Sequence, residues 1–350
     1  MNKLYIWRTA RIVQETPDTI TIEFNTGAEK FDYKAGQFIN ITILVNGAPV
    51  TRSYSLSSAP GVDEQPAVTI KKVPGGLMSS YIVDNAENVQ HWQVDGPYGA
   101  FIRPLKSQHI VLLAAGSGFT PCFSIAKSVL HHLPTTQLTI IYANRSTEYI
   151  IFNGMIEKWI DTFKNRITII HALSQQAQDM KLPTGELVLS RLNKIIVKKL
   201  IKKHVPGHLP EAHYFICGPS SLIKIQEESL AELAVPSENI FVERFRPDEN
   251  PKPVELPQDM HEVMLHFYEQ SNLLEVRPGT SILTSALEDR ITLPYSCNSG
   301  TCGKCTARLT AGAVTMVSNY VLRKEELDAG MILLCQSYPL NDEVTIEIDV

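Results

Sequence analysis

Three cysteines lie within the nine residues CNSGTCGKC, at Cys297, Cys302 and Cys305, and Cys335 follows much later in MILLCQSYP. The spacing C-x4-C-x2-C with a distant fourth cysteine is typical of ligands to a plant-type [2Fe-2S] cluster. Such a cluster needs four thiolates that converge on two irons from a loop with little room for side chains. The pattern therefore predicts these four cysteines as cluster ligands.

The two glycines of this loop support a cluster over other uses of cysteine. Gly300 and Gly303 can adopt positive φ and turn backbone N–H groups toward the sulfurs. Structural zinc sites usually use paired C-x2-C knuckles, and this loop has one close pair. A thioredoxin-like C-x-x-C would need a βαβ setting, which the flanking sequence lacks. Zinc and disulfide readings remain as alternatives.

A second group of residues has the types needed to bind a phosphorylated ring compound. RSYSLSS places a cation, an aromatic ring and a hydroxyl at strand spacing, as Arg52, Tyr54 and Ser55. GGLMSSY places Gly76 and Ser79 where a helix could begin, and a helix N-terminus attracts anions. Taken singly, each motif also fits an ordinary half-buried strand or helix cap.

A third motif, AAGSGFTP, closes an apolar run and precedes a helical pattern. Gly116 and Gly118 would permit a tight turn and close approach of a pyrophosphate to the backbone. The next apolar run ends in IIYANRST, where an acidic residue would favour a ribose 2′-hydroxyl and arginine a 2′-phosphate. Arg145 and Ser146 thus predict a preference for NADPH over NADH.

Composition limits the class of protein that carries these motifs. The chain has 350 residues, a formal charge of −5 and a pI near 6.1, which indicates no nucleic-acid or membrane partner. The start MNKLYIWRTARIVQE has no apolar signal region, and no segment approaches the roughly 20 apolar residues of a spanning helix. We expect a cytoplasmic protein, where clustered cysteines bind metal more often than they form disulfides.

The pattern of apolar residues changes twice along the chain and predicts three domains. Residues 1–104 alternate apolar and polar positions in short runs, as in an antiparallel β-barrel. Residues 105–246 alternate buried strands with helical periods, as in an α/β domain with a parallel sheet. Residues 247–259 are rich in proline and acidic side chains and predict a linker. Residues 260–350 return to short strands with one short helix, an α+β pattern.

The order and spacing of the motifs carry a resemblance. R-x-Y-S, G-x-x-S, GPYGAF, G-x-G-x-x-P and C-G-P, over about the first 246 residues, resemble the ferredoxin–NADP reductase family. Residues 260–350 resemble plant-type ferredoxin, which has the β-grasp fold. Together they resemble the reductase components of bacterial oxygenases, including those of aromatic-compound (phenylacetyl-CoA) degradation.

The resemblance implies a flavin site in the first domain. Arg52 matches the residue on the flavin phosphates, and Tyr54 and Ser55 match the pair beside the isoalloxazine, where they count as catalytic candidates. Gly76 and Ser79 match a second phosphate contact. The cofactor would be FAD, although relatives with FMN share the same R-x-Y-S motif.

The resemblance also implies a nucleotide site in the second domain. Gly116, Gly118, Thr120 and Pro121 match the NADPH loop. Cys217 matches the cysteine beside the nicotinamide, a third catalytic candidate, and its ordinary reading is a buried thiol at a strand end.

At the end of that domain, Glu243 and Phe245 match a segment in which an aromatic residue lies against the flavin. A simple β-strand explains this pair equally well.

The implied activity is electron transfer from NADPH through FAD to the cluster, and then to an oxygenase component or a similar acceptor protein. NADH as donor, a flavodoxin or ferredoxin reductase, and a non-enzymatic electron-transfer module are the alternatives. Nucleotide-oxidising subunits of dihydroorotate dehydrogenase have a much shorter interval before the last cysteine. The sequence does not name the acceptor.

One segment, RLNKIIVKKLIKKHVPGHLP, is unusually basic. Its lysines are most simply a solvated helix face, and docking of an acidic partner is the alternative reading; they are Lys194, Lys198, Lys199, Lys202 and Lys203.

Overall fold

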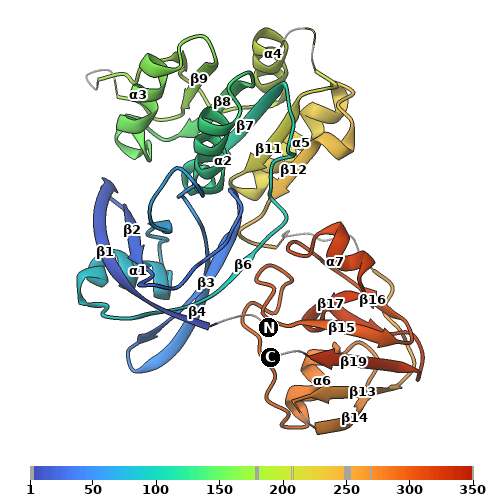
Figure 1. Ribbon diagram of the computed structural model, residues 1–350. Coiled ribbons are helices and arrows are strands. Elements are labelled where there is room, and N and C mark those ends of the chain that lie inside the picture. The colour runs from blue at the N-terminus through green and yellow to red at the C-terminus, as the bar shows by residue number, and fades with distance from the viewer. Residues whose placement is uncertain are drawn as a thin grey trace.

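Three β-sheet units follow one another along the chain in the computed structural model (Figure 1). The structure describes residues 4–177, 181–205, 207, 209–247, 254–268 and 270–348. Residues 248–253, in the first half of the predicted linker, lie outside the described residues. The predicted multidomain fold, an antiparallel barrel, a parallel α/β sheet and an α+β ferredoxin-like unit, is confirmed.

The first unit is an antiparallel sheet in the order β4-β3-β6-β1-β2-β5. Alternating apolar residues face inward, and Trp7, Phe24 and Trp92 form much of a closed core. Helix α1 and the short η1 cover one end. The elements are β1 (Leu4–Thr16), β2 (Thr19–Asn25), β3 (Phe38–Val45), β4 (Ala48–Ser55), β5 (Ala67–Lys71), α1 (Leu77–Asn85), η1 (Ala86–Asn88) and β6 (Trp92–Tyr98).

The second unit is a parallel sheet in the order β10-β9-β8-β7-β11-β12. Its central strands are buried on both faces, because α2 and α3 cover one side and α4 and α5 the other. The strands are β7 (His109–Ala115), β8 (Gln137–Asn144), β9 (Ile167–Leu173), β10 (Glu186–Val188), β11 (His213–Cys217) and β12 (Ile240–Glu243). The helices are η2 (Gly116–Gly118), α2 (Phe119–His132), η3 (Thr147–Tyr149), α3 (Asn153–Thr162), α4 (Lys194–His204), α5 (Ser220–Glu232) and η4 (Ser237–Asn239).

The third unit is a mixed sheet in the order β14-β13-β19-β15-β17, beside the small pair β16–β18. Helix α6 begins after Ser281, whose Oγ accepts a hydrogen bond from the Thr284 N–H at 3.2 Å. The elements are β13 (His261–Phe267), β14 (Gln270–Val276), α6 (Ile282–Glu288), β15 (Thr306–Ala311), β16 (Val314–Met316), α7 (Lys324–Asp328), β17 (Met331–Leu333), η5 (Leu334–Gln336), β18 (Ser337–Pro339) and β19 (Val344–Ile348).

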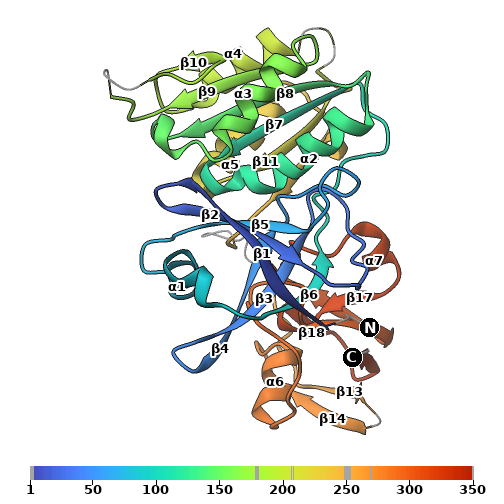
Figure 2. The ribbon, with the colours of Figure 1, turned by 60° about the vertical axis from the view of Figure 1, so that its left-hand side comes forward.

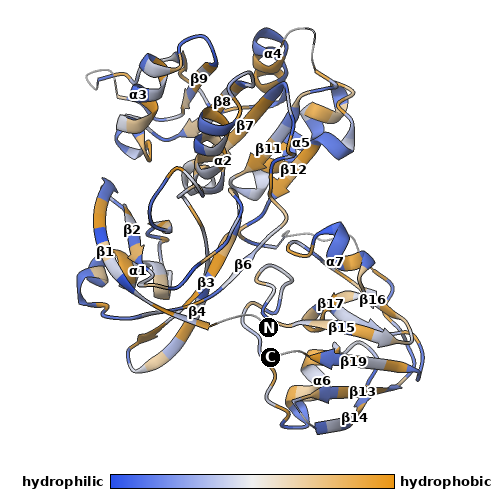
Figure 3. Cartoon of the chain, in the orientation of Figure 1, coloured by the Kyte–Doolittle hydropathy of each residue, from blue (hydrophilic) through white to orange (hydrophobic). Residues whose placement is uncertain are grey.

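The third unit lies directly against the barrel, as the two views show (Figures 1 and 2). Phe38 of β3 belongs to the apolar core of the third unit, although it comes from the barrel. Hydropathy colouring shows apolar strands in the parallel sheet and polar outer faces on its helices (Figure 3). None of the helices in the described ranges is long and apolar enough to cross a membrane.

The basic helix α4 forms ion pairs within its own unit. Lys194 Nζ lies 2.5 Å from a Glu232 carboxylate oxygen, and Lys198 Nζ lies at the same distance from the other. Lys203 lies 2.7 Å from Glu186. These contacts favour the simpler reading of α4 as a solvated helix face.

Candidate electron-transfer site

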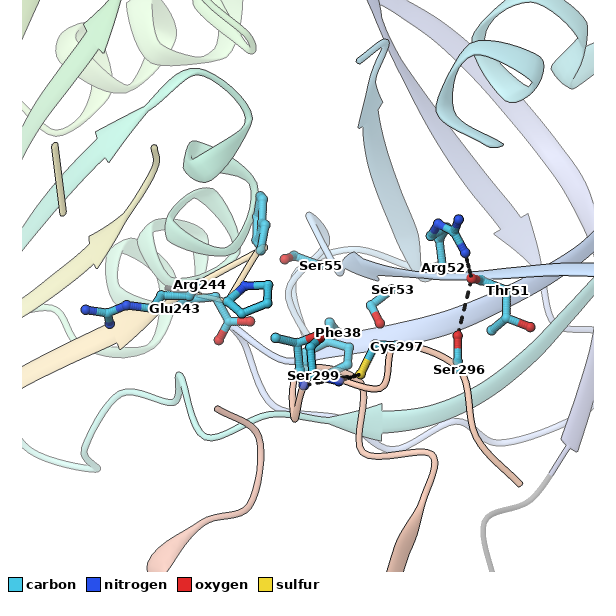
Figure 4. Close-up of a pocket in the computed structure, with 13 residues that line it drawn as sticks. Phe38, Thr51, Arg52, Ser53, Ser55, Glu243, Arg244, Ser296, Cys297 and Ser299 are labelled. Carbon is cyan, nitrogen blue, oxygen red and sulfur yellow. Dashed lines mark hydrogen bonds between the residues drawn. The ribbon is translucent and has the colours of Figure 1, made fainter. Parts of the chain in front are cut away.

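A cavity of about 330 Å³ opens where the barrel, the end of the nucleotide sheet and the cysteine loop meet. Figure 4 shows Glu243 and Arg244 on one side, Arg52 on the other, and Ser53 and Cys297 between them. Its lining residues come from segments far apart in sequence; they are Phe38, Thr51, Arg52, Ser53, Ser55, Glu243, Arg244, Phe245, Pro247, Ser296, Cys297, Ser299 and Thr301. We call it the junction cavity.

The predicted flavin motif reaches this cavity from strand β4. Arg52 and Ser55 line it, with Arg52 exposed and Ser55 buried. Tyr54 is half-buried and packs against the barrel core, and it does not line this cavity. Burial raises the pKa of the Tyr54 hydroxyl above its ordinary value. The structure therefore places Tyr54 beside the cavity residues but not in the cavity wall.

The second predicted phosphate contact lies at the start of α1. Gly76 immediately precedes the helix, and Ser79 Oγ accepts a hydrogen bond from the Val73 N–H at 3.2 Å. A Cβ on Gly76 would lie 2.7 Å from that same hydroxyl, so the turn leaves no room for a side chain. Neither Gly76 nor Ser79 lines the junction cavity or the second cavity described below, whereas Val73 lines the second.

Glu243 is the most unusual titratable group of the junction cavity. It ends β12 and is only 6% exposed. Within the described part of the chain nothing hydrogen-bonds to its carboxyl, and burial raises its pKa to about 8. Its register partner on β11 is Cys217, and burial likewise raises the pKa of that thiol. Both groups are therefore neutral at pH 7.

A larger cavity of about 760 Å³ lies at the carboxyl ends of the parallel strands. This edge of an open α/β sheet is where such folds bind ligands. Gly116 and Gly118 line it, and Gly116 has a φ of +52° with open space where a Cβ would be. A Cβ on Gly118 would collide with the Cys217 carbonyl, so the two loops approach closely only because Gly118 lacks one. We call this the nucleotide cavity.

Two other predicted residues of this region are not among those that line the nucleotide cavity. Thr120 is buried, and its hydroxyl donates to the Ser117 carbonyl at 2.9 Å, which closes the turn before α2. Ser146 is also buried and lies 3.5 Å from Glu148 Oε1. Their predicted contacts with a nucleotide remain predictions.

Arg145 lines the nucleotide cavity and belongs to a charged group that joins two units. Its guanidinium lies 4.2 Å from the Tyr149 ring centre and 3.5 Å from Asp18 of the barrel. Lys71 Nζ also lies 3.5 Å from Asp18, and burial lowers the pKa of Lys71. Lys71 and Arg191 line the same cavity. Neither was predicted from the sequence, because neither lies in a recognisable motif.

The cysteine loop brings all four predicted ligands together. The thiols contact in the pairs Cys297–Cys302 and Cys305–Cys335, and Cys297 also reaches Cys335. Cys302, Cys305 and Cys335 are buried, whereas Cys297 is partly exposed at the junction cavity. Within the described ranges, no three His, Cys, Asp or Glu side chains surround a single ion position. Pairwise contact suits a [2Fe-2S] cluster, in which each iron takes two thiolates.

Backbone groups of the loop are directed at the sulfurs. The N–H groups of Ser299 and Thr301 donate to Cys297 Sγ, each at 3.4 Å. The Lys304 N–H donates to Cys302 Sγ at 3.5 Å. Gly300 and Gly303 have φ of +73° and +70°, as predicted. Such N–H donors stabilise negative charge on a thiolate-bound cluster, so the residues present fit this cofactor.

Three family models match the chain in the same order as its units. They are the oxidoreductase FAD-binding domain over residues 9–102, the oxidoreductase NAD-binding domain over 112–228, and the 2Fe-2S iron-sulfur cluster binding domain over 267–340. The chain is therefore an oxidoreductase with FAD, NAD(P) and [2Fe-2S] domains.

Comparison with solved structures supports the same architecture. Phthalate dioxygenase reductase, described as a modular structure for electron transfer from pyridine nucleotides to [2Fe-2S], matches with a TM-score of 0.58 at 21% identity, covering 99% of this chain and 98% of that one. An intact type IV self-sufficient cytochrome P450 monooxygenase matches with a TM-score of 0.75 at 19% identity, and this chain spans 41% of its length. These likenesses show the fold.

Relatives match along nearly their whole length. The ferredoxin reductase component of 3-ketosteroid-9-alpha-monooxygenase from Mycobacterium tuberculosis is 30% identical over 365 residues, covering 97% of this chain and 94% of the relative. One component of the 1,2-phenylacetyl-CoA epoxidase from Escherichia coli is 29% identical over 360 residues, covering 100% of this chain and 99% of the relative. The chain thus belongs to the family of FAD- and [2Fe-2S]-containing reductase components of multicomponent oxygenases.

Proposed function

We propose that the protein oxidises NADPH and passes the electrons one at a time, through FAD and a cluster on its four clustered cysteines, to an oxygenase component. The junction cavity is the observation that carries this proposal. Its wall joins the predicted flavin motif, the end of the nucleotide sheet and Cys297. A flavin ring in that cavity would lie next to the end of the nucleotide sheet, where the electron donor would bind. It would also lie next to Cys297 of the loop that would hold the cluster, which is the electron acceptor.

Each unit contributes a distinct part of the chemistry. Bound FAD supplies the exchange between paired and single electrons, which is chemistry of the cofactor. Arg52 would neutralise a flavin phosphate, and Ser55 would hydrogen-bond the ring. Glu243, neutral at pH 7, can donate a hydrogen bond within the cavity. Phe245 lines both cavities and would separate flavin from nicotinamide until the nucleotide binds.

The preference for NADPH over NADH is part of this proposal. Arg145 and Lys71 line the nucleotide cavity as cations, and Arg191 adds a third. Cations bind the negatively charged 2′-phosphate of NADPH, whereas the uncharged ribose 2′-hydroxyl of NADH gains little from them. We expect Arg145→Ala to raise KM for NADPH by about 10-fold, the loss of one charge-assisted contact, and to leave KM for NADH nearly unchanged. Steady-state kinetics with both nucleotides checks this.

The acceptor is proposed to be the oxygenase of an aromatic-compound pathway, with phenylacetyl-CoA epoxidase as the first candidate. The relative of that name matches over 99% of its own length. The proposed setting is the cytoplasm, where clustered cysteines bind metal more often than they form disulfides. If this protein supports NADPH-dependent turnover by a reconstituted phenylacetyl-CoA epoxidase, the assignment is supported. If it supports turnover by a steroid monooxygenase alone, the steroid monooxygenase becomes the proposed acceptor.

Cofactor loading gives the first test of the function. The purified protein should show flavin absorption together with the broad visible absorption of a [2Fe-2S] cluster. Cys335→Ser should lose the cluster absorption and the iron, and should keep the flavin and NADPH oxidation with ferricyanide as acceptor. Cys122→Ser, a buried cysteine outside the cluster loop, is the matched control and should retain both cofactors. A wild-type protein without flavin and iron would refute the proposal.

A further inference from the structure

One buried side chain joins the flavin motif to the cysteine loop. Asn40 of β3 is completely buried, although it lies on the outward face of the barrel sheet. The third unit covers it there. Its side-chain Nδ2 donates to the backbone carbonyl of Cys302 at 3.1 Å, across the boundary between the two units. A buried amide is stable only when its polar atoms have partners.

The other atoms of the Asn40 amide are bonded within the barrel. Nδ2 also donates to Asp95 Oδ1 at 2.9 Å, and Oδ1 accepts from Ser53 Oγ at 2.7 Å. Ser53 lies between the Arg52 and Tyr54 positions of the flavin motif and lines the junction cavity. The flavin motif and the Cys302 carbonyl are therefore connected through two hydrogen bonds to one amide. Both amide hydrogens are used, so the orientation of the amide is fixed.

Asp95 extends this network to a second residue of the cysteine loop. Its Oδ1 also accepts from the Tyr98 hydroxyl at 2.8 Å, and its Oδ2 lies 3.5 Å from Lys304 Nζ. Asp95 is 7% exposed, and the Lys304 side chain is 24% exposed. Partly buried pairs of this kind are screened by salt less than surface pairs.

The boundary around these polar groups is closely packed. A Cβ on Gly303 would lie 3.0 Å from the Tyr98 ring, so the loop approaches that ring only because Gly303 has none. Phe38 lies with its ring centre 5.8 Å from that of Tyr98 and is buried in the core of the third unit. The hydrogen bonds of Asn40 therefore lie within a closely packed boundary between the barrel and the third unit.

We propose that Asn40 is a positioning residue for electron transfer from the flavin to the cluster, with Asp95, Tyr98 and Lys304 as its supporting network. The inference rests on the proposed role of Cys302 as a cluster ligand. Bound FAD would take the electron pair from NADPH and give it up one electron at a time to the cluster, which the acceptor protein would reoxidise between the two steps, with the flavin proton going to solvent. Asn40 takes no part in the redox change and fixes the loop in place.

The principal test removes the amide and follows the transfer step alone. Asn40→Ala is prepared with both cofactors, and a laser-flash electron donor reduces the flavin without NADPH. The rise of reduced-cluster absorption should slow on the order of 10-fold, because misplacing reacting groups by ~1 Å costs up to ~100-fold in rate. Flavin reduction by NADPH, measured by stopped flow, should keep its wild-type rate.

A readout independent of turnover accompanies the kinetics. Hydrogen exchange at the backbone amides of residues 298–305 should become faster in Asn40→Ala, because the loop loses its anchor to the barrel. Flavin content, iron content and the electron paramagnetic resonance spectrum of the reduced cluster should remain as in the wild type. A wild-type protein without the cluster would put the ligand assignment at fault, whereas loss of the cluster in Asn40→Ala alone moves the transfer test to Lys304→Met.

Thr42→Val is the matched control. Thr42 lies two residues further along the same outward face, and its hydroxyl pairs with that of Thr51 at 2.7 Å within the barrel. This variant loses a hydrogen bond of the same strand and should transfer electrons at the wild-type rate. Equal slowing in both variants, or an unchanged rate in Asn40→Ala, would overturn the proposal.

Lys304→Met covers the case in which Asn40→Ala fails to load both cofactors. It leaves the barrel core intact and removes only the contact of Lys304 with Asp95. We expect a smaller slowing, about 3-fold, in the same transfer step, since this contact supports the loop less directly than the Asn40 hydrogen bond. An unchanged transfer rate in Lys304→Met would then refute the network.

Discussion

Glu243 shows how the environment of a residue, more than its sequence neighbours, decides its chemistry. In VERF it reads as one polar position of a strand. The fold buries its carboxyl at the junction cavity beside the neutral Cys217 thiol, with Arg244 turned away to Glu227 at 2.7 Å. A pKa of about 8 follows from this burial. The family resemblance predicted that Glu243 lies near the flavin. Nothing in the sequence predicted the raised pKa of its carboxyl.

The raised pKa of Glu243 predicts a pH dependence of stability. In the unfolded chain a glutamate ionises near 4.5, so the folded state binds the proton more tightly between about pH 4.5 and about pH 8. The contribution of Glu243 to stability is therefore greatest at low pH and is lost as pH rises through that range. Glu243→Gln stays neutral, and its Tm should fall less than that of the wild type between pH 5 and 8. Parallel Tm–pH curves by scanning calorimetry would contradict the assignment.

Two glycines of the nucleotide loop should respond differently to alanine. Gly116→Ala meets open space and only the cost of a left-handed backbone, about 1 kcal/mol of unfolding free energy. Gly118→Ala collides with the Cys217 backbone and must move one loop away from the other. We expect its KM for NADPH to rise on the order of 10-fold, since small misplacements are costly. Similar KM values for both variants would show that the close approach does not shape the site.

At the scale of elements, the sequence predicted what is local and missed what assembles from distant strands. The cysteine spacing, the positive φ of Gly300 and the βαβ pattern are local, and the structure contains them. Lys71 on β5 and Asn40 on β3 belong to ordinary strand patterns. Both residues matter because they contact residues of another unit, and a single sequence carries no signal for such contacts.

Asp18, in the turn between β1 and β2, supplies a prediction at this scale. It lies 3.5 Å from both Arg145 and Lys71 and so competes with any phosphate for their charge. Asp18→Asn should lower KM for NADPH by about 3-fold, the effect of one screened ion pair, with little change for NADH. Asp63→Asn, which breaks an ion pair with Lys127 away from the nucleotide cavity, is the control. A fall in KM for both nucleotides alike would contradict this explanation.

At the scale of the whole molecule, residues of all three units meet at the junction cavity. Their order along the chain was readable from the motifs and is that of the family models. Their docking was not readable, because it depends on surface residues such as Lys304 and Ser296, whose hydroxyl lies 3.4 Å from the Thr51 carbonyl. The structure places the Cys297 side of the loop toward the flavin motif.

Anaerobic mixing with one equivalent of NADPH tests the central claim most directly. Absorption and electron paramagnetic resonance, followed together, report the flavin and the cluster separately. We expect loss of flavin absorption first, followed by the signal of a reduced [2Fe-2S] cluster, with the second phase absent in Cys335→Ser. A flavin that is reduced while the intact wild-type cluster stays oxidised would contradict it.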